Sequence, residues 1–98
     1  MKFKSKKLAN KYRLSLEGEC LFGSAAALKS KLLNAINKNT PIELDLSQVS
    51  EIDTSCYQLI VQFTQECTTD GVELSIGKMS KAFTDVVNIY GMDNYFNC

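Results

Sequence analysis

The sequence predicts a single α/β domain whose sheet is mixed, mostly parallel and open to water on one face. Segments with an apolar residue at every second position alternate along the chain with segments of helical periodicity. This order implies crossover connections and therefore parallel neighbours. The expected strands also carry polar residues between the apolar ones, whereas a parallel sheet covered on both faces shows continuous apolar runs. We therefore expect the helices mainly on one face of the sheet.

The N-terminal segment differs from the rest of the chain. Residues 1–11 contain five lysines and little periodicity, so we expect a basic, solvated lead-in ahead of a domain that spans residues 12–98. Tyr12, Leu14 and Leu16 alternate with polar residues and predict the first strand. Gly18 allows a turn, after which a short second strand is expected over residues 19–22.

The remaining elements follow from helical and strand periodicity together with capping and turn residues. The first is a helix capped by Ser24 and ended by Asn39 and Pro41, followed by a strand over 42–46 and a polar turn. Next come a helix over 54–69 capped by Asp53 and a strand over 72–76 ended by Gly77. A helix capped by Ser80 with Gly91 after its end follows, and in the tail Met92, Tyr95 and Phe96 fold back onto the core.

The composition argues against several classes of function. The chain has no histidine and a net charge of zero, and it has no glycine-rich phosphate loop, so neither an enzyme nor a nucleic-acid-binding protein is expected. No apolar run approaches the roughly 20 residues that span a bilayer. The basic N-terminus lacks the apolar centre of a signal peptide. We therefore expect a cytoplasmic protein that does not insert into membranes.

The four cysteines do not form a metal or disulfide pattern. None belongs to a CxxC pair. Cys56 and Cys67 share one expected helix at a separation of roughly 16 Å, which is too far for a shared metal or a disulfide. We expect buried free thiols, with Cys56 facing inward. A nucleophilic Cys56 at the helix start is the third-ranked alternative, because no paired base accompanies it.

The most informative stretch runs from the central strand into the second helix. Asp53 is placed to cap this helix, and the hydroxyls of Thr54 and Ser55 follow at its positive end. Two interpretations stay open. Short polar side chains after an N-cap commonly serve only to satisfy backbone amides. Alternatively, one hydroxyl accepts a phosphate, which the helix N-terminus tolerates electrostatically.

Carboxylates are frequent in the same region, but they do not predict a metal site or a cofactor. Glu43 and Asp45 are expected on the open face of the sheet, whereas Asp53 caps a helix elsewhere. A solvated acidic surface is the better interpretation of these residues and of Glu51.

Three stretches together resemble the STAS family, the domain shared by sulphate transporters and anti-sigma factor antagonists. They are Leu16-Glu17-Gly18-Glu19, then Leu44-Asp45-Leu46-Ser47 through Ile52-Asp53-Thr54-Ser55, and finally Tyr90-Gly91-Met92-Asp93-Asn94-Tyr95-Phe96. The resemblance covers residues from about 12 to 96 and implies the STAS fold. Family members usually carry glycine and leucine where this chain has Cys56 and Tyr57.

The resemblance implies a bacterial regulatory module without catalysis of its own. Thr54, or alternatively Ser55, matches the residue that is phosphorylated in the antagonists. The implied partners are a serine/threonine kinase-type anti-sigma regulator, which supplies the ATP, and a phosphatase. Some members instead keep the fold without phosphorylation, so the alternative is an accessory subunit that binds the ATPase of a lipid-transporting ABC system, or part of a chemosensory complex.

The partner-binding surface is expected around the start of the second helix. Tyr57 and Val61 lie one helical turn apart beside the buried stripe, with Tyr57 at the more exposed angle. They either pack under a neighbouring helix or form an apolar contact for a docking protein, and both interpretations stay open. The full expected set is Asp53, Thr54, Ser55, Tyr57, Gln58 and Val61.

Overall fold

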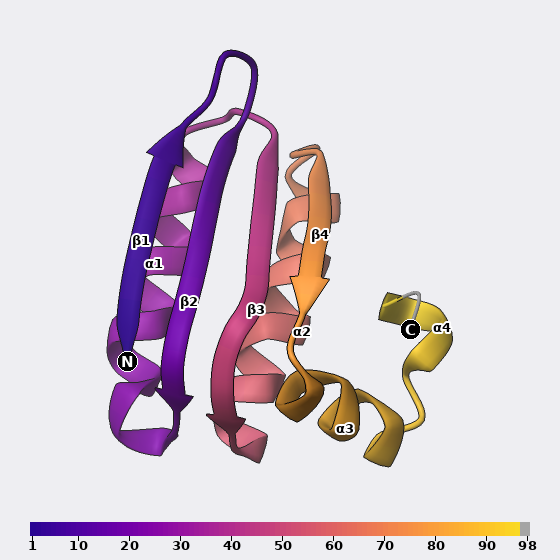
Figure 1. Cartoon of the computed structure of the whole chain (residues 1–98). Coiled ribbons are helices and arrows are strands. Elements are labelled where there is room, and N and C mark those ends of the chain that lie inside the picture. The colour runs from indigo at the N-terminus through magenta and orange to yellow at the C-terminus, as the bar shows by residue number, and fades with distance from the viewer. Residues whose placement is uncertain (97–98) are drawn as a thin grey trace.

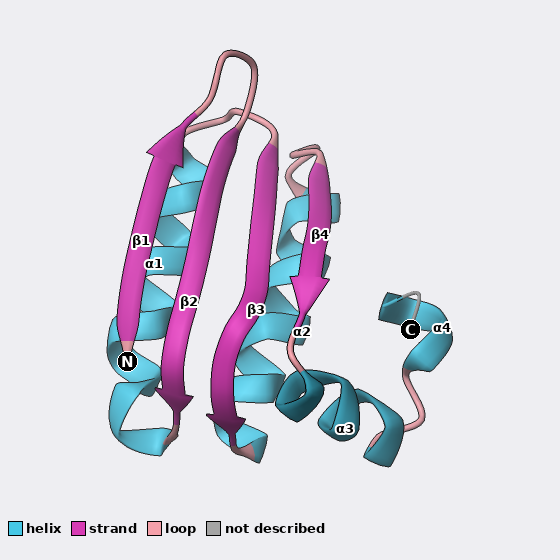
Figure 2. Cartoon of the chain, in the orientation of Figure 1, coloured by secondary structure: helices cyan, strands magenta, loops and turns pink. Residues whose placement is uncertain are grey.

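The structure is a computed structural model that describes residues 1–96. Figure 1 shows a sheet with helices behind it, and Figure 2 separates the two kinds of element by colour. The strands are β1 (Lys2–Lys7), β2 (Tyr12–Cys20), β3 (Ile42–Ile52) and β4 (Leu74–Met79). The helices are η1 (Phe22–Ser24), α1 (Ala25–Asn37), α2 (Thr54–Thr69), α3 (Lys81–Ile89) and α4 (Asp93–Phe96).

The sheet is mixed and mostly parallel, which confirms the predicted fold class. Within the described residues the strand order is β1-β2-β3-β4. The β1–β2 pair is antiparallel, and the β2–β3 and β3–β4 pairs are parallel. Helices α1 and α2 lie side by side behind the sheet, whereas α3 lies below the lower end of β4 and α4 to the right of it in the view of Figure 1.

The two faces of the sheet differ as the alternating pattern predicts. Leu14, Leu16 and Leu44 are almost fully buried and belong to the core. The intervening residues of the central strands point to the open face, where Glu43 accepts from Arg13 Nε at 2.8 Å and from Lys11 Nζ at 2.5 Å. These two hydrogen bonds hold the pKa of the Glu43 carboxyl below its usual value.

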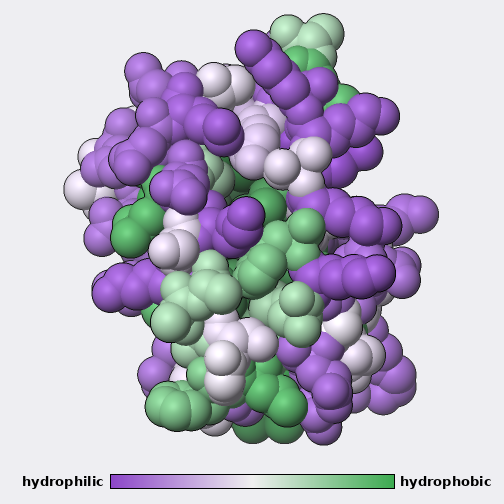
Figure 3. Space-filling view, turned by 90° about the vertical axis from the view of Figure 1, so that its left-hand side faces the viewer, coloured by the Kyte–Doolittle hydropathy of each residue, from purple (hydrophilic) through white to green (hydrophobic). Residues whose placement is uncertain are grey.

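The basic segment is not an irregular lead-in, because residues 2–7 form the edge strand β1, although most of their side chains are exposed as expected. Its register on β2 runs from Lys2 opposite Glu17 to Lys7 opposite Tyr12. Phe3 packs against the core, and its ring lies 5.9 Å from Lys31 Nζ. Exposed lysines are a common device for keeping an edge strand from pairing with another chain. Figure 3 shows the side of the molecule that was on the left in Figure 1, where hydrophilic side chains surround a smaller apolar area.

The structure also corrects the predicted limits of three strands. The strand expected over residues 19–22 does not form, since β2 continues through Gly18 to Cys20 with a register shift between Gly18 and Glu19. The polar turn expected after residue 46 is also wrong, because β3 pairs with β2 as far as Ile52. Gly77 does not end β4 but lies within it. Pairing with neighbouring strands, rather than local composition, sets these limits.

The helices match their predicted positions closely, but the expected cap of α1 does not form, because the Ser24 side chain makes no capping hydrogen bond. α2 spans Thr54–Thr69 and is capped by Asp53. α3 is capped by Ser80, whose hydroxyl accepts from the Phe83 amide at 3.2 Å. Gly91 follows α3 with a φ of 66°, a conformation that glycine adopts at little cost. The tail folds back as expected and places Phe96 in the core, although its last residues form the short helix α4.

Candidate functional site

Asp53 joins the end of β3 to the start of α2 and is the most constrained residue of the candidate site. One carboxylate oxygen accepts from the Cys56 amide at 3.0 Å and from the Ser55 hydroxyl at 2.8 Å. The other accepts from the Phe22 amide at 2.6 Å. These hydrogen bonds, the Cys56 amide first, lower the pKa of Asp53. Asp53 is therefore a fixed negative charge that ties α2 to the connection between β2 and α1.

Thr54 is exposed at the first position of α2, and its hydroxyl is already engaged. Its Oγ1 lies 2.8 Å from the hydroxyl oxygen of Tyr90, at the end of α3. Tyr90 is 42% exposed. Sequence reasoning did not assign Tyr90 to the site, because no local pattern relates residues 36 positions apart. The available signals were the stretch from Tyr90 to Phe96 that resembles the family and the expectation that the C-terminal tail folds back onto the core.

Tyr57 is buried, so it does not take the more exposed angle that was expected and instead packs under a neighbouring helix, the other interpretation left open. The side chain is only 2% exposed. Its ring stacks on Tyr90 at 4.8 Å between centroids and 9° between planes, and its hydroxyl donates to Met92 Sδ at 3.1 Å. Phe83 and Phe96 lie at tilted angles around it. The chain from α3 to α4 covers this flank of α2, which removes Tyr57 from the solvent.

The other expected contact residues differ in their access to a partner. Ser55 is half-buried and donates to Asp53. Gln58 is exposed on α2, and Val61 is partly buried against the core. Two large apolar side chains that the sequence did not single out are far more exposed: Phe22 at 77% and Ile89 at 78%. The Phe22 amide donates to the Asp53 carboxylate, and Ile89 directly precedes Tyr90 in the sequence.

Cys56 faces inward, as predicted. Its side chain is 0% exposed and its thiol donates to the Leu21 carbonyl oxygen at 3.3 Å. Burial raises the pKa of Cys56 and also that of Cys20. A protonated, enclosed thiol is a poor nucleophile. Cys67 is likewise free and buried, with a pKa raised to about 11 by desolvation. Cys98 lies outside the described residues.

The described residues do not assemble a metal centre. No group of three or more histidine, cysteine, aspartate or glutamate side chains is placed to hold an ion among residues 1–96. Glu43 and Asp45 lie on the open face, away from the carboxylate of Asp53, which caps α2. In the part of the chain that is described, no helix is both long and apolar enough to cross a bilayer.

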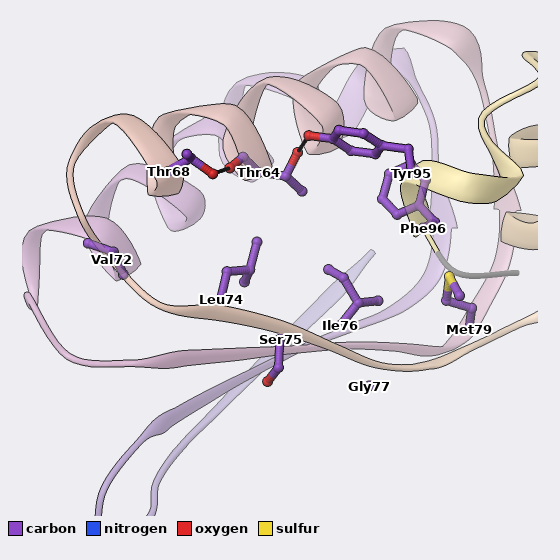
Figure 4. Close-up of a pocket in the computed structure, with 10 residues that line it drawn as sticks. All are labelled: Thr64, Thr68, Val72, Leu74, Ser75, Ile76, Gly77, Met79, Tyr95 and Phe96. Atoms are coloured by element: carbon purple, nitrogen blue, oxygen red, sulfur yellow. Dashed lines mark hydrogen bonds between the residues drawn. The ribbon is translucent and has the colours of Figure 1, made fainter.

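A pocket of about 590 Å³ lies between α2, β4 and α4 (Figure 4). Leu74 and Ile76 point into it from β4, and Tyr95 reaches across to form a hydrogen bond with Thr64. Its lining contains hydroxyl and apolar side chains but no carboxylate, lysine or arginine. Thr54 is not among the residues that line this pocket.

Comparison with known proteins identifies the fold. A family model described as "Mlab, STAS domain" matches residues 4–96. No curated protein sequence matches. An anti-sigma factor antagonist structure from Mycobacterium paratuberculosis is 16% identical with a TM-score of 0.84, covering 97% of this chain and 81% of that one. The phosphorylated form of the Bacillus cell fate determinant SpoIIAA is 16% identical with a TM-score of 0.73, covering 96% and 87%. This chain also matches the structure of Mglu at 23% identity and a TM-score of 0.69, with 80% of this chain covering only 20% of that one.

Proposed function

The chain belongs to the Mlab STAS-domain family, and from this premise we propose that it is a regulatory protein-interaction module switched by phosphorylation of Thr54. The observation that supports the proposal best is the exposed Thr54 hydroxyl at the start of α2, beside the fixed carboxylate of Asp53. The donor is a serine/threonine kinase-type anti-sigma regulator, which brings its own ATP and Mg²⁺, and a phosphatase restores the hydroxyl. The module works in the cytoplasm and has no catalysis of its own.

Electrostatic repulsion explains why phosphorylation of Thr54 should weaken partner binding. A phosphate carries a charge of about −1.5 to −2 near neutral pH. Asp53 already accepts from the Cys56 amide in the first turn of α2, so the new charge meets a carboxylate that holds the helix end. Among the hydrogen bonds and ion pairs of residues 1–96, none brings a lysine or arginine to Thr54. A phosphate desolvated in a complex would therefore lack a compensating charge from this chain, and binding weakens.

The partner-binding surface surrounds Thr54. Its polar part includes Asp53, Ser55 and Gln58 from the expected set, and Val61 forms its margin. Exposed apolar groups suit a docking surface, and Phe22 and Ile89 supply them beside the site. Tyr57 supports this surface from below through its stack on Tyr90, instead of contacting the partner directly.

The test mixes purified variants of this chain with a kinase-type anti-sigma regulator in titration calorimetry. Thr54→Ala should bind within about 1 kcal/mol of the parent, which is the typical value of one modest hydrogen bond. Thr54→Glu should weaken binding by about 2 kcal/mol or more, because it buries an unpaired charge. Ser55→Ala is the matched control and should still be phosphorylated at Thr54, as read by mass spectrometry. The switch is refuted if Thr54→Glu binds as tightly as the parent and no phosphate is found on Thr54 of the kinase-treated parent.

The second candidate is a constitutive accessory subunit that binds a transporter ATPase or a chemosensory complex. The hydrogen bond between Thr54 and Tyr90 favours it, because a hydroxyl with a structural partner has a role without phosphorylation. This candidate uses the same surface. A transporter ATPase gene beside this one, together with binding that Thr54→Glu leaves intact, would support it over the switch.

A further inference from the structure

Tyr90 links the candidate phosphorylation site to the end of α3 through two different contacts. Its hydroxyl lies 2.8 Å from Thr54 Oγ1, and its ring stacks on Tyr57. Its backbone belongs to the final turn of α3, where the Tyr90 amide donates to Val86 at 3.1 Å and the Met92 amide donates to Val87 at 3.0 Å. We infer that Tyr90 couples the phosphorylation state of Thr54 to the order of this final turn, an inference that rests on the proposed function.

Phosphorylation of Thr54 removes the hydrogen bond between its Oγ1 and the Tyr90 hydroxyl. In the transfer, a bond forms between Oγ1 and the γ-phosphorus of the partner's ATP, and the bond from that phosphorus to ADP breaks. The hydroxyl proton passes to a base of the partner. Oγ1 is then an ester oxygen without a hydrogen, so it no longer donates and accepts only weakly. The hydrogen bond between Thr54 and Tyr90 is lost in its present form.

The surroundings of Thr54 direct the new group toward Tyr90. Asp53 lies on the α2 side, and its carboxylate is held in place by the Cys56 and Phe22 amides. Like charges repel, so the phosphate turns away from Asp53. On the α3 side the Tyr90 hydroxyl occupies the space 2.8 Å from Oγ1. The phosphate therefore displaces Tyr90 from its stack on Tyr57, and the final turn of α3 loses the side chain that anchors it to α2.

This displacement also changes the proposed docking surface. Ile89, the exposed apolar residue at 78%, immediately precedes Tyr90. When the final turn of α3 loosens, the exposed side chain of Ile89 no longer has a fixed position next to Tyr90. Phosphorylation thus acts twice, by adding charge at Thr54 and by disordering the apolar contact next to Tyr90.

The test needs no partner. The full chain is made with Thr54→phosphoserine by genetic encoding, and amide hydrogen exchange is compared with that of Thr54→Ser. Exchange at residues 90–92 should become about fivefold faster or more, because these amides depend on local order at the helix end. Tyr90→Phe, which keeps the ring and removes the hydroxyl, should produce part of this increase without any phosphate.

Tyr95→Phe is the matched control. It removes the hydroxyl from a second threonine–tyrosine pair, the one with Thr64 on the same helix. Exchange at residues 90–92 should stay at the parental rate in this variant. If Thr54→phosphoserine leaves exchange at 90–92 unchanged, or if Tyr95→Phe raises it as much as Tyr90→Phe, the coupling through Tyr90 is refuted. The proposed function fails separately, by the binding titration, so the two outcomes are distinguishable.

Discussion

Replacement of Asp53 by alanine should cost more stability than the loss of an ordinary helix cap. An N-cap side chain contributes typically about 1 kcal/mol. Asp53 fulfils this role through the Cys56 amide, but its second oxygen also accepts from the Phe22 amide at 2.6 Å. A hydrogen bond to a charged group contributes about 1.5 to 3 kcal/mol. Because the residue is only partly buried, we take the lower end and expect a loss of about 2 to 3 kcal/mol for Asp53→Ala.

The matched control is Ser80→Ala, which removes the cap of α3. Ser80 accepts from one amide, that of Phe83, and carries no charge. Its loss should cost about 1 kcal/mol. For a domain of this size, each kcal/mol lowers the melting temperature by about 4 to 8 °C. The expected decreases in melting temperature are therefore about 8 to 24 °C for Asp53→Ala and about 4 to 8 °C for Ser80→Ala. Thermal unfolding followed by circular dichroism measures them, and urea unfolding gives the free energies.

The comparison tests what Asp53 contributes beyond an ordinary cap, namely the bond to the Phe22 amide together with the Ser55 bond and the negative charge. If the two substitutions cost the same, the second oxygen of Asp53 contributes nothing, and the proposed tie between α2 and the β2–α1 connection is wrong. A further variant, Asp53→Asn, retains one acceptor oxygen without the charge and should fall between the parent and Asp53→Ala.

Three other predictions follow from burial and charge. Tyr57→Ala should lower the free energy of unfolding in urea by about 3 to 5 kcal/mol. Gln58→Ala, on the exposed face of α2, should change it by less than about 0.5 kcal/mol. Similar effects of the two substitutions would contradict the buried position of Tyr57. The thiol of Cys56 should react with an alkylating reagent far more slowly in the native protein than in urea, and fast native labelling would show a reactive thiolate. The pKa of Asp53 is lowered in the folded state, so its carboxylate stabilises the protein above the ordinary aspartate pKa of about 4, and this stabilisation is lost as the pH falls further. Asp53→Asn should therefore lose less stability in acid than the parent. An equal loss would assign the acid dependence to other carboxylates.

Features that depend on local chemistry could be predicted from the sequence. Asp53 caps α2 through an amide three residues away, and Ser80 caps α3 in the same manner. The alternation along β2 and β3 also predicted which face of the sheet is open. Cys56 was expected inward because it begins the apolar stripe of α2, and it is fully buried.

Features that depend on distant partners could not be predicted in the same way. β1 consists mostly of lysines and lacks an apolar pattern, so only its pairing with β2 reveals it as a strand. The extension of β3 to Ile52 has the same origin, because the polar residues after Leu46 are held by β2. The hydrogen bond between Thr54 and Tyr90 requires α3 to lie against the start of α2, which no spacing within either helix specifies.

The unusual residue at position 57 and the missed contact at position 90 explain each other. A tyrosine where family members usually carry leucine brings a larger ring and a hydroxyl into the space beneath α3. The hydroxyl has a partner in Met92 Sδ, and the flat face of the ring is covered by Tyr90. Stacked aromatic pairs are favourable beyond the area that they bury. Tyr90, held by this stack, then has its hydroxyl within reach of Thr54. The buried ring of Tyr57 therefore helps to hold the Tyr90 hydroxyl at Thr54.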